Sequence, residues 1–306
     1  MLRLSTKPQR RPRIGLALGS NRLSAARLSP ADEGWSVDWS RETMLSESLF
    51  RDEPTARHES VLCETVGAIA SEAARAYEPV HIALPDAAAS FAVFPLEELP
   101  EGDASRRELV RWSFENDRHL RGDDFACAYQ AMGVDEDNKH LMYACAQPQR
   151  WLDVLLRACK QAGIVPWAID TAFAFHFNRL QDRLDVAPDG GAALIIGPQD
   201  WTLLVWDNQL RPRLIRSRWL EETEDAAATT AQEVERLLRA YLRGDARRSV
   251  SRLYLSGTGI VAERVGQALN ARARMPVIRI DLCADISGEP VPAGLPRTAV
   301  IAAVAR

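Results

Sequence analysis

The sequence predicts an α/β protein built from two lobes, and three observations lead to this. Short apolar runs alternate with amphipathic helical stretches along the whole chain, which is typical of mixed α/β folds. The pattern strand–Gly–turn–strand occurs twice, at 13–29 and at 192–209. Between the two occurrences, DVAPDGG at 185–191 consists of turn-forming residues and marks a domain boundary. The length of 306 residues also exceeds the size at which a single core usually stops growing.

The chain begins with a basic segment over residues 1–12. It carries Arg3, Lys7, Arg10 and Arg11 with two prolines and little apolar content. We interpret it as a solvated tail, with a weak patch for anionic lipid headgroups as the alternative.

The first lobe is predicted over 13–185, with a small inserted α+β subdomain at about 86–146. Within that subdomain, Asp103 is a candidate N-cap and VDEDN at 134–138 forms an acidic turn between two strands. Gly163 ends the helix that follows, as expected of a glycine in the C′ position. The expected strands are 13–19, 23–29, 34–40, 80–85, 87–96, 125–134, 139–147 and 164–170, and the expected helices are 56–77, 103–115, 148–162 and 171–184.

The second lobe is predicted over 192–306. Its helix at 226–243 has an apolar face formed by Val234, Leu238 and Tyr241 and a polar face of mixed charge, which indicates packing on a sheet rather than on a membrane. The other expected elements are strands at 192–197, 201–209, 210–218, 251–257 and 276–282, a helix at 260–271 and a C-terminal helix from about Pro296.

Composition excludes several classes of protein. The formal net charge is −4 and gives no electrostatic footprint for nucleic acid. The five cysteines form no CxxC pair and favour a reducing compartment. No apolar run is long enough to span a membrane and the basic start lacks the apolar core of a signal peptide, so we expect a cytoplasmic protein. The five histidines have no metal-site spacing, and no metal site is expected.

The chain resembles the PilM family of type IV pilus assembly proteins, including its MshI branch. The resemblance lies in the order and spacing of LVRWSFENDRHLRGDDFACAYQAMG, HLMYACAQPQRWLDVLLRACKQAGIVPWAIDTAFAFHFNRL and SRLYLSGTGIVAERVGQALNARARMPVIRIDL. HIALPDAAASFAVFPLEELP is similar to the segment that leads into the family's small subdomain. The family is similar to actin, Hsp70 and sugar kinases, so the resemblance implies a two-lobed actin-like ATPase fold.

The resemblance also places a nucleotide site and shows that it is degenerate here. In the first turn Gly19 and Ser20 keep the family's pattern, but Ala17 stands where an acid is expected. In the second turn Gly197 is kept, whereas Ile195 replaces the acid and Pro198 removes a backbone N–H. Because Mg²⁺ prefers carboxylate oxygens, these losses remove its anchors.

Two further motifs complete the comparison with the family. Asp170 survives in the connecting motif, where capping of the next helix is its structural alternative, but Ala172 replaces the second acid. Gly257, Thr258 and Gly259 keep the glycine-rich motif on the adenosine side. Residual nucleotide binding would therefore use Gly19, Ser20, Asp170, Gly197, Gly257, Thr258 and Gly259, with no catalytic residue.

These expectations lead to a non-catalytic cytoplasmic scaffold, a pseudo-ATPase, peripheral to the inner membrane. By resemblance it would bind the N-terminal cytoplasmic segment of a PilN-like membrane protein through the region 86–180. One alternative is an active actin-like Mg²⁺-ATPase that uses Asp170 and Asp200, and another is the cytoplasmic part of a GspL-like type II secretion component. GspL-like proteins continue into a membrane span, and the end of this chain at 306 disfavours this second alternative. No cofactor is expected, while ATP binding without hydrolysis and homo-oligomerisation stay open.

Overall fold

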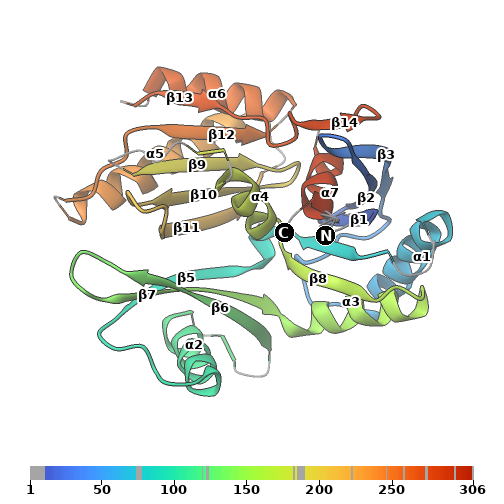
Figure 1. Ribbon diagram of the computed structural model, residues 1–306, viewed down its shortest axis with the longest axis horizontal. Helices are drawn as coiled ribbons and strands as arrows, with labels where there is room; N and C mark the ends of the chain where they lie inside the picture. The colour runs from blue at the N-terminus through green and yellow to red at the C-terminus, as the bar shows by residue number, and fades with distance from the viewer. Residues whose placement is uncertain are drawn as a thin grey trace, which may run out of the picture.

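A computed structural model describes most of the chain. The described residues are 11–73, 78–118, 120–121, 124–181, 183–184, 190–221, 223–245, 247–257, 259–272, 275–292 and 294–304. The predicted basic tail therefore lies outside the described residues, except for its last two positions. Figure 1 shows two sheets side by side with a smaller sheet below them.

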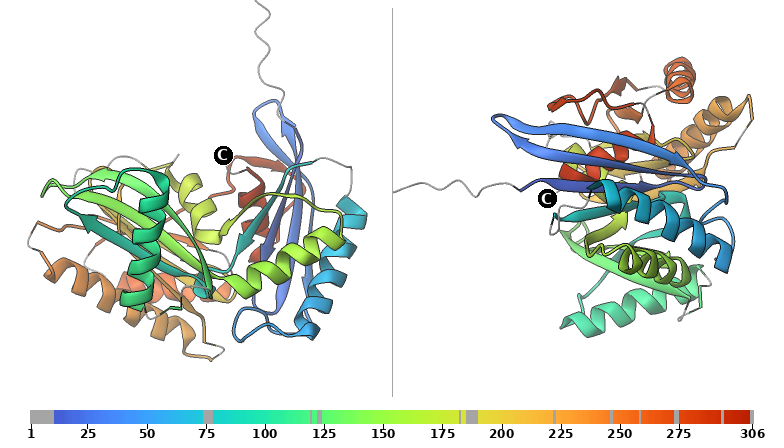
Figure 2. Two further views of the ribbon diagram at one scale, coloured as in Figure 1. Left: turned by 90° about the horizontal axis from the view of Figure 1, so that it is seen from below. Right: turned by 90° about the vertical axis from the view of Figure 1, so that its right-hand side faces the viewer.

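The first sheet has six strands among the described residues, in the order β14-β3-β2-β1-β4-β8. The strands are β1 (Arg13–Leu18), β2 (Arg22–Ala31), β3 (Gly34–Met44), β4 (Val80–Leu84), β8 (Pro166–Thr171) and β14 (Ile286–Gly288). Helices α1 (Ala56–Ala73) and α3 (Gln149–Gln161) cover one face, and α7 (Leu295–Val304) covers the other (Figure 2).

Strand β1 shows why both faces are covered. Its residues Ile14, Leu16 and Leu18 belong to the core beneath α1 and α3, whereas Ala17 belongs to the core that contains α7. Gly15 lets α7 come close, because a Cβ there would lie 1.8 Å from the carbonyl oxygen of Ala299. Small residues on this face of β1 are therefore dictated by the packing of a helix on the backbone.

The inserted subdomain is a three-stranded sheet with one helix, over residues 90–148. Its order is β5-β7-β6, with β5 (Ser90–Leu96), β6 (Phe125–Val134), β7 (His140–Pro148) and helix α2 (Asp103–Arg118). Phe114 on α2 is fully buried against Phe94 and Phe125. Trp112 on the same helix is 60% exposed, so these two aromatic residues have different roles.

The second lobe is built on a five-stranded sheet in the order β11-β10-β9-β12-β13. Its strands are β9 (Gly191–Ile196), β10 (Asp200–Trp206), β11 (Pro212–Trp219), β12 (Leu253–Gly257) and β13 (Val277–Arg279). Helices α5 (Ala226–Arg243) and α6 (Ile260–Arg272) cover one face. Helix α4 (Ala172–Gln181) connects the lobes, and Phe173, Phe175 and Phe177 bury it in the core shared with α7 and the inner face of β9.

The chain returns to the first lobe at its C-terminal end, which the predicted division at 192–306 did not anticipate. Strand β14 pairs in parallel with β3, from Ile286 opposite Trp35 to Gly288 opposite Val37. Helix α7 packs on β1, β2 and β4. Residues 286–304 thus belong to the first lobe by strand pairing and packing, and α7 covers the inner face of its sheet together with α4, which contacts β4 and β8.

Candidate functional site

The two hairpin turns of the expected nucleotide site face each other across the lobes, and one side chain joins them. The first turn lies between β1 and β2, and the second between β9 and β10. The Oε1 atom of Gln199 accepts hydrogen bonds from the backbone N–H groups of Ser20 at 2.6 Å and Asn21 at 3.3 Å. Its Nε2 atom donates to Oδ1 of Asn21 at 2.7 Å. The first turn's N–H groups therefore point at an oxygen supplied by the protein itself.

Glycine 19 makes this contact possible. A Cβ at this position would lie 2.5 Å from Oε1 of Gln199, closer than real Cβ contacts allow. Both Ser20 and Gln199 are buried.

Other backbone groups of the two turns also have partners within the protein. The carbonyl oxygen of Ser20 accepts from the backbone of Leu49 at 2.5 Å, and that of Asn21 accepts from Leu45 at 2.8 Å. The carbonyl oxygen of Gln199 accepts from the backbone of Leu220 at 2.8 Å. The turns are thus fixed from both sides.

A buried carboxylate, Asp86, forms a junction beside the turns. Its Oδ1 accepts the backbone N–H of Phe173 at the start of α4, at 2.7 Å, and its Oδ2 accepts the hydroxyl of Thr202 on β10, also at 2.7 Å. Asp86 opens the short helix η1 (Asp86–Ala88) that leads from β4 to the small subdomain. The side chain of Asp86 therefore joins η1, the start of helix α4 and strand β10 of lobe two.

Asp200 lies next to this junction on β10. Its Oδ2 accepts the backbone N–H of Ala87 at 3.3 Å. Burial of the carboxyl raises the pKa of Asp200 to about 6. Burial, followed by the neighbouring charge of Asp200, raises the pKa of Asp86 well above its usual value. Because both carboxyls are buried next to each other, protonation of at least one of them is favoured near neutral pH.

Among the described residues three cavities adjoin the turns, and one of about 400 Å³ is lined by Arg51, Pro198 and Gln199. Of the other two, the larger, of about 370 Å³, lies between α6, the 279–283 segment and α7, and its lining includes Gly197, Gly257 and Gly259. The smaller holds only about 20 Å³ and is bordered by Gly19, Asp86, Gln199 and Asp200. His176 borders both of these cavities, and burial lowers its pKa to about 4. The space between the two turns is therefore almost filled, whereas the space near Gly257 is open.

The structure brings together most of the predicted site residues. Gly19, Ser20 and Gly197 meet at the facing turns, and Gly257 and Gly259 border the cavity of about 370 Å³. Asp170 does not join them at the turns, because it lines none of the three cavities and its Oδ1 accepts the N–H of Thr171 at 2.8 Å. Its charge nevertheless contributes to the raised pKa of Asp86. Thr258 lies outside the described residues.

Sequence reasoning missed two residues of this site, Asp86 and Gln199. The only signal for Asp86 is an acid directly after the proline that ends a buried strand. Gln199 has none, because its role depends on a turn nearly two hundred residues away. Within the part of the chain that the structure describes, no three His, Cys, Asp or Glu residues gather closely enough to hold a metal ion.

Comparison with solved structures identifies the fold. A chain of a PilM–PilN type IV pilus biogenesis complex superimposes with a TM-score of 0.71 at 17% identity, over 97% of this chain and 96% of that one. A protein with an actin-like ATPase fold and unknown function from Bacteroides thetaiotaomicron gives a TM-score of 0.57 at 15% identity, over 98% of each chain.

The chain has the actin-like ATPase fold.

A third solved structure has the same actin-like fold in a secretion system. The cytoplasmic domain of EpsL, an inner membrane component of the type II secretion system of Vibrio cholerae, matches with a TM-score of 0.50 at 12% identity. It covers 89% of this chain and 98% of that domain. No family model and no curated protein matches the sequence.

The residues at the turns do not fit the Mg²⁺-nucleoside triphosphate that the actin-like fold implies. Ala17 and Ile195 are buried apolar residues at the positions where the resemblance expects acids. Pro198 has no N–H to offer, and the N–H groups of the first turn are already bonded to Gln199. Phosphoryl transfer depends on positioned phosphates and neutralised charge, and neither requirement is met by these residues.

Proposed function

We propose that this protein is a non-catalytic scaffold of a type IV pilus or related secretion assembly platform at the cytoplasmic face of the inner membrane. The observation that carries the proposal is the side chain of Gln199, whose amide oxygen lies where a phosphate oxygen would have to bind. The likeness to a PilM–PilN complex and to EpsL supports the choice of assembly. None of the helices in the described ranges is long and apolar enough to cross a membrane.

The free edge of β8 is the surface we propose for a partner protein. This strand ends the first sheet, with no further strand beyond it among the described residues, and it lies next to the small subdomain (Figure 1). Val80 pairs with Pro166 and His81 with Ala168, so Trp167 is a bulge residue without an opposite partner. Trp167 is 75% exposed, and Val165, directly before β8, is 85% exposed. An unpaired strand edge with exposed apolar side chains is suited to the addition of an extended peptide.

The proposed occupant is the N-terminal cytoplasmic segment of a PilN-like membrane protein. The chain solved in complex with PilN shares the fold of this protein over nearly its whole length. Main-chain hydrogen bonds to β8 would provide affinity, and contact with Trp167 would provide much of the specificity, because aromatic anchors dominate such interfaces.

Binding of a synthetic peptide tests the docking surface. The peptide should copy the N-terminal segment of the PilN-like protein encoded in the same genome, with a fluorophore at its C-terminus for anisotropy. We expect Trp167→Ala to weaken binding about tenfold or more, as for loss of an aromatic hot spot. Trp112→Ala is the matched control and should leave binding unchanged, since Trp112 is similarly exposed but lies on α2, on the far face of the small sheet.

The same samples test the absence of catalysis. A fluorescent ATP analogue with and without Mg²⁺, combined with a phosphate-release assay, should show no Mg²⁺-dependent binding and no turnover. Mg²⁺-dependent turnover that disappears in Asp170→Ala would contradict the scaffold and support the ATPase alternative. A peptide that fails to bind at any concentration, or that binds equally to the Trp167→Ala variant, would contradict the docking surface.

A further inference from the structure

The small subdomain is inserted into lobe one but packs against lobe two. Its first strand, β5, and the connector η1 both pack on β11, the edge strand of the second sheet. The view from below in Figure 2 shows the subdomain lying along lobe two, while the strands of lobe one stand apart from it. Chain connectivity and packing therefore assign this subdomain to different lobes.

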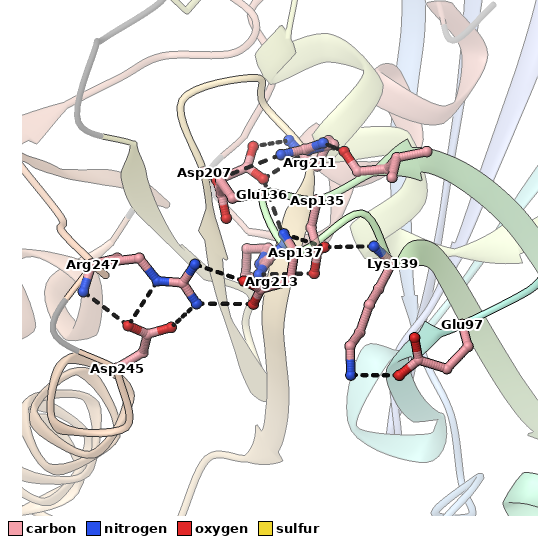
Figure 3. A network of polar contacts seen from close by, with 11 residues as sticks. Glu97, Asp135, Glu136, Asp137, Lys139, Asp207, Arg211, Arg213, Asp245 and Arg247 are labelled. Carbon is pink, nitrogen blue, oxygen red and sulfur yellow. Dashed lines mark hydrogen bonds and ion pairs between the residues drawn. The ribbon is translucent and has the colours of Figure 1, made fainter.

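At the far end of this contact, the tip of the β6–β7 hairpin is held by arginines of lobe two (Figure 3). Arg211 is almost completely buried, and its Nε donates to Asp207 at 2.7 Å within its own turn. Its Nη1 donates to the carbonyl oxygen of Val134 on the hairpin, and its Nη2 pairs with Glu136 at 3.7 Å. Arg213 pairs with Asp135 at 3.6 Å. The buried part of this contact is thus made by two neighbouring arginines around the β10–β11 turn.

A second arginine contact comes from the loop after α5. The Nη1 and Nη2 atoms of Arg247 donate to the two oxygens of Asp137 at 2.7 and 2.8 Å, and Nη2 also donates to Asp245 at 2.9 Å. This two-pronged geometry is the strongest form of arginine–carboxylate pair. Hydrogen bonding to Arg247 lowers the pKa of Asp137, so the pair is ionised at neutral pH.

Hydrogen bonds within the β6–β7 hairpin fix the shape of its tip independently of lobe two. Oδ1 of Asp135 accepts the N–H groups of Asp137 at 3.0 Å and Lys139 at 2.9 Å, which fixes the turn. Lys139 also pairs with Glu97 on the adjacent loop at 2.8 Å. The three acids at positions 135–137 are therefore presented together toward three arginines of the other lobe.

We propose that these six residues, Asp135, Glu136, Asp137, Arg211, Arg213 and Arg247, form a clasp that holds the small subdomain on lobe two as one moving unit. Motion between the lobes would then be taken up where the subdomain joins lobe one, at Pro85–Ala89 and around Pro148. The separation between β8 and the subdomain would change as the lobes move. This last consequence rests on the function proposed above, whereas the clasp itself does not.

Hydrogen exchange of the full chain, followed by mass spectrometry, tests the clasp. Arg247→Gln removes the exposed contact, and Arg211→Gln removes the buried one. We expect Arg211→Gln to speed exchange of amides in 125–148 and 207–213 about tenfold, because it leaves the buried contacts to the hairpin unmade. Arg247→Gln should speed exchange of the same amides about two- to fivefold, since an exposed ion pair contributes less than a buried one. Arg239→Gln is the matched control, since Arg239 pairs only with Glu235 of its own helix at 2.5 Å in the described structure.

The outcomes test the clasp independently of the proposed scaffold function. Unchanged exchange at the hairpin in Arg247→Gln, or an equal change in Arg239→Gln, would overturn the clasp. If Arg211→Gln fails to fold, Arg247→Gln decides alone, and Asp137→Asn must reproduce its effect. About 1 M NaCl should also loosen the exposed Asp137–Arg247 pair, since the screening length is then about 3 Å. A peptide that does not bind the unaltered chain would overturn the proposed function while the exchange result still decides the clasp.

Discussion

Gln199 uses both ends of its amide on the facing turn, with the oxygen accepting two backbone N–H groups and the nitrogen donating to Asn21. A neutral amide needs no counter-charge, so this bond is stable without a metal ion or any nearby acid. That explains why the apolar residues Ala17 and Ile195 are tolerated at the two strand positions beside it. Gly19 is needed for the close contact with Gln199, and at Gly197 a Cβ would lie 2.5 Å from Oδ1 of Asp200. Packing therefore accounts for both glycines, and their presence is not evidence of nucleotide binding.

Replacement of Asp200 by asparagine should stabilise the protein in a pH-dependent manner. The pKa of Asp200 is about 6 in the folded chain against a usual 3.8. The native state therefore binds more protons than the unfolded state between these values, and the unaltered protein loses stability as pH rises from about 4 to about 6. Asp200→Asn lacks this loss and keeps an oxygen for the N–H of Ala87. It also removes the neighbouring charge that helps to raise the pKa of Asp86, which acts in the same direction. Its advantage should be near zero at pH 4 and reach roughly 1–3 kcal/mol at pH 7.5.

Urea unfolding of both proteins at several pH values measures this difference. His81 and His176 also titrate, because burial lowers the pKa of each to about 4, with Arg13 adding to the effect at His81. Their contribution is lost as pH falls from about 6.5 to about 4, and it is common to both proteins, so it cancels. A difference in stability that does not vary with pH would refute the assignment to Asp200.

At the scale of elements, the close packing of α7 on β1 predicts the effect of substituting one glycine. Gly15→Ala places a Cβ 1.8 Å from the carbonyl oxygen of Ala299 and 2.9 Å from the backbone nitrogen of Ala303. Helix α7 must move away, and we expect a loss of about 1–3 kcal/mol, as for overpacked cores. Gly67→Ala in α1 is the matched control: a Cβ there meets nothing within 4 Å, and better helix propensity should add about 0.5–1 kcal/mol.

Thermal unfolding monitored by circular dichroism checks both substitutions. The midpoint should fall for Gly15→Ala and rise for Gly67→Ala. Equal midpoints for Gly15→Ala and the unaltered protein would mean that α7 is not held against β1.

Elements with a strong local pattern were predictable and those without one were not. Strands β1 and β9 read as apolar runs because both of their faces are covered. Strand β14 has only three residues, Ile-Ser-Gly, and forms through its pairing with β3, so nothing local marks it. The same holds at the site: Gly19 and Gly197 followed from the resemblance, whereas Asp86 and Gln199 depend on contacts between elements distant in sequence. Asp170, which has the expected residue type, does not line the cavity between the turns.

At the scale of the whole molecule, the return of the chain to lobe one predicts that the first lobe does not fold alone. A fragment of residues 11–184 lacks β14 and α7, which leaves Ala17, Ala26 and Leu28 of the sheet without the helix that shares their core. We expect this fragment to show no cooperative thermal transition. Addition of a 190–306 fragment in trans should restore one, because it supplies both missing elements.

The control for this experiment is a fragment of residues 190–284. It keeps the second sheet with α5 and α6 but lacks β14 and α7, and it should not rescue the first fragment. A cooperative transition of the 11–184 fragment alone, near that of the full chain, would refute the prediction.

The contact between Gly15 and Ala299 also has a consequence for biosynthesis. At about 5–20 residues per second, the ribosome reaches Ala299 roughly 15–60 s after Gly15. During that interval the inner face of the first sheet has no α7 to cover it, although most of the lobe has already emerged. Lobe one therefore completes its core only after α7 leaves the exit tunnel, with an apolar surface exposed to chaperones until then.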